Sequence, residues 1–390
     1  MHSWMWWRRL AGLLAVALLL IACGGQPSSD GGSQGNAEDD VIRVGVVTSL
    51  TGPNAATGRQ VAVGVQQAAA EWNERGGING RRIEVVVEDD AGSPTGAVTA
   101  YNKLISQARP AAIWLPTLAP LVMAVEPAVR EAKIPTFTSA TATVITTTGD
   151  GWFFRLRTND EKQGRLVAAY ALEELKSANP AILYPSNDYG RGGYEAIKTT
   201  LDEAGVPLVA AETFNQGDKD VSTQLRKIKA AGADLLIAWT IPTDSAMVAV
   251  QAKQVGLAIP ILGSPGFGTP EYLALAQEAT DSIHVVLDGA VGWDEQSQPF
   301  VERVQQRFPD TPVSFVVSSN YDGAMMLFAA MEKVGTDPEA LREALLATQD
   351  YQGVTGLYAF DEAGNGLHQG VLARWEGQKL VPIRTMNLKD

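Results

Sequence analysis

Cysteine and histidine are scarce in this chain. The only cysteine is Cys23, and the three histidines are His2, His284 and His368. A single cysteine excludes a disulfide within the chain, and no Cys/His spacing typical of a zinc site is present. His284 falls in the apolar stretch 283–287, where a hydrogen-bonded structural histidine is the ordinary interpretation. We therefore expect neither a metal nor a cofactor.

Catalytic motifs are missing as well. The sequence contains no G-x-S-x-G elbow and no Walker A loop. Gly266-Phe267-Gly268 lacks the third glycine of a dinucleotide fingerprint, and acidic pairs such as Glu173-Glu174 fall on solvated helix faces. Because nothing supplies a nucleophile together with a base, we expect that the protein is not an enzyme.

Basic residues are outnumbered. The chain has 31 Lys and Arg against 44 Asp and Glu, which gives a net charge of −13. A polyanionic surface argues against nucleic acid as a partner and against electrostatic membrane binding. The apolar run 10–21 follows Arg8 and Arg9 and is shorter than the ~20 residues that a spanning helix needs. This order of a basic start and a short apolar run predicts a signal peptide.

The end of that run is informative. It reads Leu20-Ile21-Ala22-Cys23, which resembles the bacterial lipoprotein lipobox and implies that Cys23 receives lipid. The alternative is an ordinary signal peptide with an incidental cysteine. Residues 24–40 are rich in Gly, Ser and Asp and predict a flexible tether. We expect a signal peptide at 1–22, a lipidated cysteine and tether at 23–40, and an extracytoplasmic protein anchored by lipid to the cell membrane.

From Val41 onward, β-rich stretches alternate with helical ones. The predicted strands of the first half are 41–47, 83–87, 111–114 and 136–138, and those of the second are 181–184, 207–213, 234–239 and 259–262. Such alternation favours parallel sheets covered by helices on both faces. Two successive sets predict two α/β lobes. Residues 353–384 change rhythm and read as hairpins, with strands expected at 353–360, 367–375 and 380–384.

Three loops that follow predicted strands carry hydroxyls and small residues. They are 48–53, 115–119 and 138–143. In open α/β sheets, ligands bind beyond the carboxyl ends of the strands, and such loops can hold a carboxylate through hydroxyls and backbone N–H groups. In any one loop, Ser and Thr can instead cap the next helix. Three such loops on one side of a lobe favour a ligand site.

Several motifs resemble one family. They are Val44-Gly45-Val46-Val47-Thr48-Ser49-Leu50-Thr51-Gly52-Pro53, Asn73-Glu74-Arg75-Gly76-Gly77-Ile78-Asn79-Gly80, Glu88-Asp89-Asp90, Ile134-Pro135, Ser139-Ala140-Thr141, Phe154-Arg155, Asn187-Asp188-Tyr189-Gly190 and Tyr321-Asp322. Together they resemble the leucine/isoleucine/valine-binding proteins over essentially the whole chain from Val41. The resemblance implies the type I periplasmic-binding-protein fold, in which two Rossmann-like lobes are joined by a hinge of crossover strands. We expect lobe 1 at 41–157 plus 289–366 and lobe 2 at 158–288 plus 367–390.

The resemblance also implies a function. It predicts a substrate-binding lipoprotein of an ABC importer that captures an amino acid, branched-chain-like, or a related small organic solute. Cleft closure would hold the solute until it is delivered to the permease. The expected partners are the small-molecule ligand and the permease and ATPase subunits, and the protein itself is expected to be a monomer. The alternative is a sensor of the same fold for an amide, urea or aromatic acid, coupled to signalling.

Site residues follow from the same resemblance. Ser139, Ala140 and Thr141 correspond to the loop that binds the carboxylate and amine of the ligand, and Tyr189 to an aromatic wall from the second lobe. Trp239, like Trp114, ends a predicted strand and is expected either to line the cleft or to lie in the core.

Other positions depart from the family pattern. Ala119 stands where the family often has Ser. Thr57, in the loop expected at 48–58, stands just before the predicted first helix, where the family often has an aromatic residue. The family's acid that pairs with the ligand ammonium would fall near Ser264, where this chain has none. A buried ammonium without a partner is costly, so Asp244, in the loop after strand 234–239, is the predicted substitute.

Overall fold

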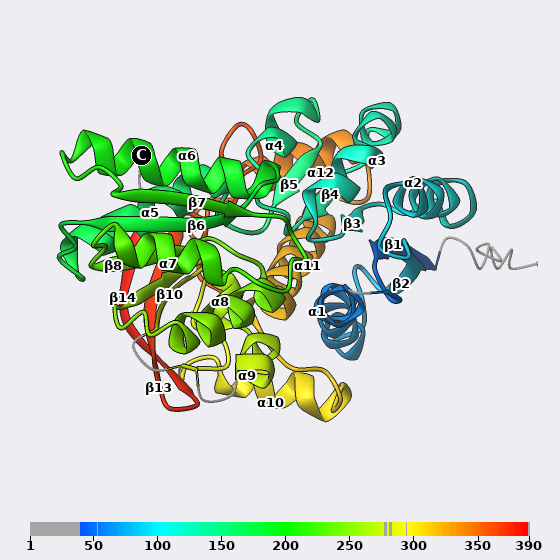
Figure 1. Cartoon of the computed structure of the whole chain (residues 1–390). Coiled ribbons are helices and arrows are strands. Elements are labelled where there is room, and N and C mark those ends of the chain that lie inside the picture. The colour runs from blue at the N-terminus through cyan, green and yellow to red at the C-terminus, as the bar shows by residue number, and fades with distance from the viewer. Residues whose placement is uncertain (1–39, 53, 277–278, 281–282, 294, 389–390) are drawn as a thin grey trace, which may run out of the picture. The chain divides into compact units, whose positions relative to one another are not determined.

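The computed structural model describes residues 40–52, 54–276, 279–280, 283–293 and 295–388 (Figure 1). The predicted signal peptide, Cys23 and all but the last residue of the tether lie outside the described residues. No helix in the described ranges combines the length and apolarity that crossing a bilayer requires.

The first sheet has five parallel strands in the order β2-β1-β3-β4-β5. Its strands are β1 (Val41–Thr48), β2 (Arg82–Asp89), β3 (Ile113–Leu115), β4 (Thr136–Thr138) and β5 (Phe153–Arg155). Side chains alternate between two cores, so that Val46 packs on one face of the sheet and its neighbour Val47 on the other. The strands are therefore apolar on both faces, as parallel strands require.

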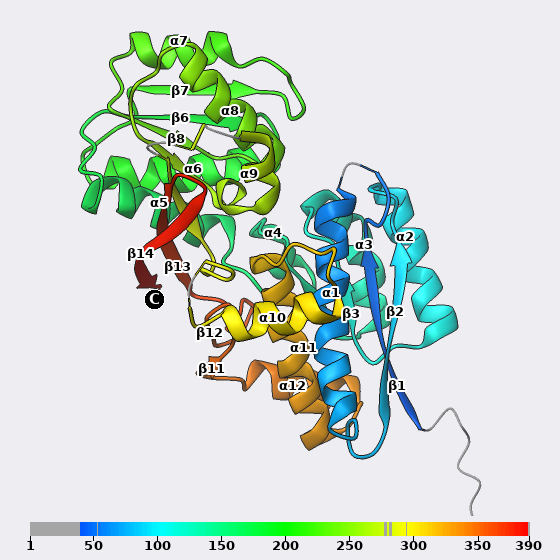
Figure 2. The same cartoon turned by 90° about the horizontal axis from the view of Figure 1, so that it is seen from below.

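Helices cover both faces of this sheet. They are α1 (Ala55–Glu74), α2 (Pro94–Lys103) with the π-turn η1 (Leu104–Ala108), α3 (Ala119–Ala132), α4 (Val144–Thr148), α10 (Gln298–Arg307), α11 (Phe315–Val334) and α12 (Pro338–Leu346). Figure 2 shows α1 alongside α11 on one face, with α2 and α3 on the other. The late helices α10–α12 thus complete the core that the first third of the chain begins.

The second sheet has seven strands in the order β14-β13-β10-β9-β8-β6-β7. They are β6 (Pro180–Pro185), β7 (Ala210–Phe214), β8 (Leu235–Ala238), β9 (Ile261–Gly263), β10 (Ile283–Leu287), β13 (Gln369–Glu376) and β14 (Lys379–Asn387). β13 and β14 run antiparallel as a hairpin at one edge, and the other strands are parallel.

This sheet is also covered on both faces. Its helices are α5 (Asp160–Glu173), α6 (Asp188–Glu203), α7 (Ser222–Ala230), α8 (Pro242–Gln254), the 3-10 turn η2 (Pro265–Gly268) and α9 (Pro270–Ala276). Helices α5 and α6 pack on one face and α7, α8 and α9 on the other (Figures 1 and 2). The predicted α/β class, with parallel sheets flanked by helices, is confirmed.

Two local predictions were wrong. Helix α1 begins at Ala55, so Thr57 lies inside it rather than before it. The first turn packs tightly because Gly58 lacks a β-carbon, which would lie 1.9 Å from the Ser49 carbonyl oxygen. Residues 353–360 do not form one strand. Only the short pair β11 (Tyr351–Gln352) and β12 (Leu357–Tyr358) forms there, since the backbone N–H groups of Val354 and Thr355 donate to Asp322 instead.

Candidate functional site

Arg155 shapes the loop that follows β4. Its guanidinium is fully buried and donates to the carbonyl oxygens of Ala140 and, at 2.9 Å, Ala142. Its Nε donates to Asn365 Oδ1 at 2.9 Å. Burial lowers the pKa of Arg155 to about 10. The cation thus ties two successive loop carbonyls to the start of a chain crossing, and it fixes the path of residues 139–143.

Within that loop the predicted residues play different parts. Ser139 is fully buried, and its hydroxyl accepts a hydrogen bond of 3.0 Å from Asn320 Nδ2 on α11. Ala140 is also fully buried. Thr141 keeps 8% of its surface exposed, and its carbonyl accepts the backbone N–H of Asp160 at 2.9 Å. Of the three, Thr141 is the residue best placed to offer a hydroxyl to a solute.

An aromatic pair lies on the second sheet's side. Tyr189, at the start of α6, packs on Trp239 with ring centroids 5.5 Å apart, and Trp239 Nε1 donates to the Tyr189 carbonyl at 3.2 Å. Burial raises the pKa of the Tyr189 hydroxyl, and the neighbouring Asp160 carboxylate raises it further. Helix α6, which carries Tyr189, also passes beside Asp160, since a β-carbon at Gly192 would lie 3.8 Å from the Asp160 side chain.

Charged groups gather where the chain crosses between the two sheets. Arg157 Nε donates to Asp288 Oδ2 at 2.7 Å, and the Arg157 guanidinium lies 4.6 Å from the centre of the Phe315 ring. Asp288 also accepts the backbone N–H of Thr158 at 3.2 Å. Thr158 Oγ1 donates to the Gln369 carbonyl at 2.8 Å. Hydrogen bonds therefore join the three segments that cross between the sheets, at Arg157–Thr158, Asp288 and Gln369. These contacts lie at the predicted lobe boundaries, which stay a prediction.

The site residues thus fall into two groups. The structure brings Thr141 and Tyr189 to the neighbourhood of Asp160, and Trp239 lies against Tyr189, fully buried in an apolar core. Sequence reasoning missed Asp160 and gave no role to Arg155, although Phe154-Arg155 belongs to the family motif. The partners of both residues are distant in sequence, and no quoted motif contains Asp160.

Within the described parts of the chain, three predicted residues are not joined directly to Thr141 or Tyr189. Asp244, in the first turn of α8, is 4% exposed, and burial raises its pKa to about 6. Its neighbours are the Gly217 amide and the side chains of Asp218 and Lys219, on the loop after the edge strand β7. Ala119 is the first residue of α3 and packs on an apolar core. Among the described residues, no hydrogen bond or ring contact joins Thr57, Ala119 or Asp244 to Thr141 or Tyr189.

Two further positions named in the sequence analysis, Ser264 and Trp114, make hydrogen bonds or ring contacts within the fold. Ser264 Oγ donates to the Thr240 carbonyl at 2.7 Å and accepts the Thr240 N–H at 3.0 Å. Trp114 is fully buried and stacks on Phe137, with ring centroids 4.6 Å apart. Trp114 is thus a core residue.

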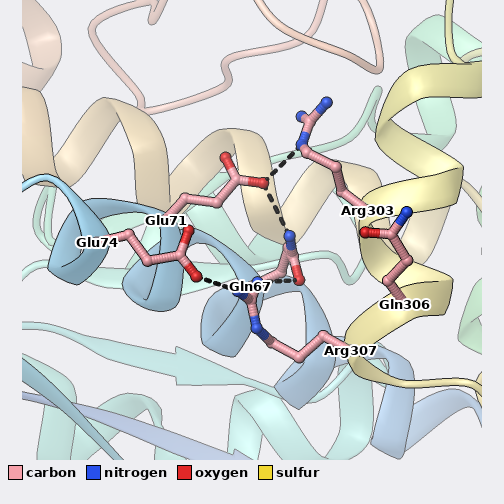
Figure 3. A pocket seen from close by; sticks show the side chains of 6 residues that line it. All are labelled: Gln67, Glu71, Glu74, Arg303, Gln306 and Arg307. Carbon is pink, nitrogen blue, oxygen red and sulfur yellow. Dashed lines mark hydrogen bonds and ion pairs between the residues drawn. The ribbon is translucent and has the colours of Figure 1, made fainter.

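A separate cavity of about 440 Å³ lies between α1 and α10 (Figure 3). Its lining residues are Gln67, Glu71, Glu74, Arg303, Gln306 and Arg307. Glu71 pairs with Arg303 at 2.9 Å, and Arg307 binds both Gln67 and Glu74. These charged side chains pair with one another, and the cluster is an ion-pair network that joins the two helices. Across the described residues, no group of His, Cys, Asp or Glu is arranged to hold a metal ion.

Comparisons with known proteins agree with this architecture. The sequence profile of the family described as "Periplasmic binding protein" matches residues 41–379. The leucine-, isoleucine-, valine-, threonine- and alanine-binding protein of Pseudomonas aeruginosa is 29% identical over 84% of this chain and 87% of its own. A Leu/Ile/Val-binding protein of Rhizobium johnstonii is 27% identical over 87% of this chain and 93% of its own.

Solved structures show the same fold. The branched-chain amino acid transporter substrate binding protein LivJ from Streptococcus pneumoniae, in complex with isoleucine, aligns with a TM-score of 0.79 at 24% identity, over 88% of this chain and 99% of its own. A solute binding protein of R. palustris in complex with 4-hydroxybenzoate aligns with a TM-score of 0.82 at 21% identity, over 90% of this chain and 98% of its own. The predicted type I periplasmic-binding-protein fold is confirmed, and the chain belongs to the periplasmic binding protein family.

Proposed function

We propose that this protein is the solute-binding component of an ABC importer and not an enzyme. It captures an amino acid, branched-chain-like, or a related small organic solute, and delivers it to the permease and ATPase subunits. The observation that carries the proposal is the convergence of Thr141, from the loop after β4, and Tyr189, from the start of α6, beside the charged crossings. A small molecule that contacts both residues would bridge the two sheets.

The ligand-binding residues in this proposal are those predicted from the sequence. Ser139, Ala140 and Thr141 form the polar side, and Tyr189 with Trp239 forms the aromatic side. Ala119, Thr57 and Asp244 are kept as flanking candidates. We propose that the protein acts as a monomer outside the cytoplasm, held to the membrane by lipid on Cys23.

A second class of ligand has support of its own. Where the family's acid would stand, Ser264 uses its hydroxyl on Thr240. A solute without an ammonium group has no need of that acid. Solute binding proteins of this fold have been solved with benzoate and with 4-hydroxybenzoate. A receptor for an aromatic acid, amide or urea, coupled to transport or to signalling, is therefore the competing proposal.

A thermal-shift screen against amino acids, amides, ureas and aromatic acids tests the proposal. A ligand at 100 times its dissociation constant stabilises the folded state by about 2.7 kcal/mol, which raises the melting temperature visibly. Tyr189→Ala should reduce the shift. The matched control is Tyr184→Ala, since Tyr184 stacks on Tyr194 elsewhere in the same sheet layer, with ring centroids 4.7 Å apart. Equal loss of the shift in both variants would contradict the assignment of Tyr189.

A further inference from the structure

His368 lies directly before β13, beside the crossing at Gln369, and both nitrogens of its ring are engaged. Nε2 lies 2.9 Å from the Ala359 carbonyl oxygen and 3.1 Å from that of Asn365, and Nδ1 lies 2.9 Å from Lys162 Nζ. Carbonyl oxygens only accept, so Nε2 carries the proton, and an ammonium only donates, so Nδ1 offers its lone pair. These partners assign His368 as a neutral imidazole with its proton on Nε2.

One side of the ring holds the turn at 359–366. The side chain of Asn365, in that turn, accepts a hydrogen bond of 2.9 Å from Arg155 Nε. Arg155 in turn donates to the Ala142 carbonyl at 2.9 Å, in the loop after β4. Through this turn the imidazole is connected to the loop that carries Thr141.

The other side of the ring holds the first turn of α5. Lys162 is the third residue of that helix, and its backbone N–H donates to the side chain of the N-cap residue Asn159 at 2.8 Å. Two residues earlier, the Asp160 N–H donates to the Thr141 carbonyl at 2.9 Å. The helix that Lys162 holds in place is therefore bonded to the same loop.

Together these contacts form a closed hydrogen-bonded circuit around the loop after β4. It runs from His368 through the turn at 359–366 and Arg155 to the loop, and from the loop through α5 back to Lys162. His368 joins the two halves because its neutral Nδ1 is the acceptor. A proton on Nδ1 would remove that acceptor and place a second cation 2.9 Å from the Lys162 ammonium, where like charges repel. Protonation would thus open the circuit at this bond.

Other charged groups lie on the elements that meet at His368. They are Asp160, Glu161 and Arg165 on α5, Asp361 and Glu362 in the turn, and Arg155. Glu161 pairs with Arg165 at 2.6 Å, and Asp361 accepts the N–H groups of Ala363 and Asn365. Burial raises the pKa of Asp160 to about 6, so a test must separate Asp160 from His368.

We propose that His368 is a positioning residue of the solute site, and that a second proton on its imidazole weakens solute capture. His368 acts through Lys162 and Asn365, which hold the start of α5 and the loop after β4 together, and not by contact with the solute. The inference rests on the proposed function, since it concerns the same site. Histidine side chains ordinarily change charge between about pH 5 and 8, so affinity should rise with pH in that range.

The test uses the mature chain, purified without bound solute, and calorimetric titration at about pH 5.5, 6.5 and 7.5. The probe is whichever of leucine, isoleucine, valine and benzoate wild type binds most tightly, since each keeps its charge over this range. A hit from the wider screen replaces it if none of the four binds. Wild type should bind the probe about 3- to 10-fold more weakly at the lowest pH than at the highest, on the scale of one hydrogen bond. Binding should also release protons, which titrations in buffers of different ionisation enthalpy measure.

Three variants identify the titrating group. His368→Asn keeps an oxygen that can accept from Lys162 but takes up no proton, so its affinity should not change with pH. Lys162→Met removes the cation that opposes protonation, and it should reduce the pH dependence. His284→Asn is the matched control, because His284 lies on β10 and its Nδ1 has no hydrogen-bond partner among the described residues. It should keep the pH dependence of wild type.

The outcomes separate this inference from the proposed function. A pH dependence that survives in His368→Asn would assign the proton to another group, such as Asp160, and overturn the inference. If His368→Asn does not fold, an undiminished dependence in Lys162→Met refutes it. Wild-type affinity that is constant with pH refutes it without any variant. Solute capture stands in all these cases. If wild type binds none of the probes and nothing in the wider screen, the proposed function is contradicted, and this inference with it.

Discussion

At the residue scale, the hydroxyl of Thr141 is the most specific feature of the loop after β4. The chain around it is held by Arg155, and the neighbouring Ser139 hydroxyl is bonded to Asn320. Replacing Thr141 by Ala therefore removes one hydroxyl from a loop whose path is set by other contacts.

We expect Thr141→Ala to weaken ligand binding by about 1.5–3 kcal/mol if the hydroxyl meets a charged group of the ligand. Titration calorimetry with the ligand found in the screen measures the loss. Thr147→Ala is the control, since the Thr147 hydroxyl donates to the Val144 carbonyl within α4. Thr141→Ser should retain most of the affinity, and a serine variant as weak as the alanine variant would show that the methyl group matters instead.

Burial raises the pKa of Asp160 to about 6 from its ordinary value of 3.8. Between these two values the folded state holds a proton that the unfolded state releases. The contribution of Asp160 to the free energy of unfolding is therefore greatest at low pH and declines as the pH rises through this window. Wild type should lose more stability than Asp160→Asn between about pH 4 and pH 6. Urea denaturation of both proteins measures this difference, and parallel pH profiles would contradict the shift.

At the element scale, helix α6 carries Tyr189 and packs against Trp239 through a glycine. A β-carbon at Gly193 would lie 2.2 Å from the Trp239 ring, whereas one at Gly192 would lie 3.8 Å from Asp160, an ordinary contact. The two adjacent glycines of one helix therefore differ sharply in the space around them.

Gly193→Ala should reduce the free energy of unfolding by roughly 1–3 kcal/mol, because the fully buried Trp239 must shift. It should also weaken ligand binding, since Tyr189 rests on that ring. Gly192→Ala, the matched control, should be neutral or stabilising by up to ~1 kcal/mol through helix propensity. Urea midpoints of the two variants give the comparison, and equal midpoints would contradict the packing described for Trp239.

The elements differ in how far the sequence predicts them. Strands β1, β2 and β4 are apolar runs bounded by turn residues, and their predicted and observed positions agree closely. The start of α1 was misplaced because Gly58 is read as a loop residue, whereas its contact with Ser49 makes it a packing requirement. The strand expected at 353–360 fails because Asp322, which is distant in sequence, takes the N–H groups of Val354 and Thr355.

The site was also predictable only in part, because some of its residues stand in local motifs and others depend on contacts between distant parts of the chain. The loop at 139–141 and Tyr189 stand directly after strands, in motifs that the family resemblance marks. Asp160 and Arg155 depend on contacts with Thr141 and Asn365 that only the folded chain creates. Asp244 satisfied the sequence criterion of an acid after a strand, but that strand's loop faces the β7 edge of the sheet.

At the scale of the whole molecule, the predicted anchor can be tested apart from binding. Cys23→Ala should release the protein from the membrane fraction or leave an uncleaved precursor, because lipid attachment needs the thiol. Metabolic labelling with a fatty acid, followed by fractionation, is the measurement. Ligand affinity should not change, since a flexible tether is expected between anchor and fold. Undiminished lipid labelling of the variant would refute the role of Cys23.

The central claim is that a small solute joins the two sheet layers and closes them on each other. Small-angle scattering from the mature protein, with and without a ligand at proven saturation, tests it most directly. The contacts of Arg157 with Asp288 and of Thr158 with Gln369 would act as the hinge. Closure about a hinge brings the lobes together around the solute. The account predicts a smaller radius of gyration with ligand. An unchanged scattering curve at full occupancy would contradict it.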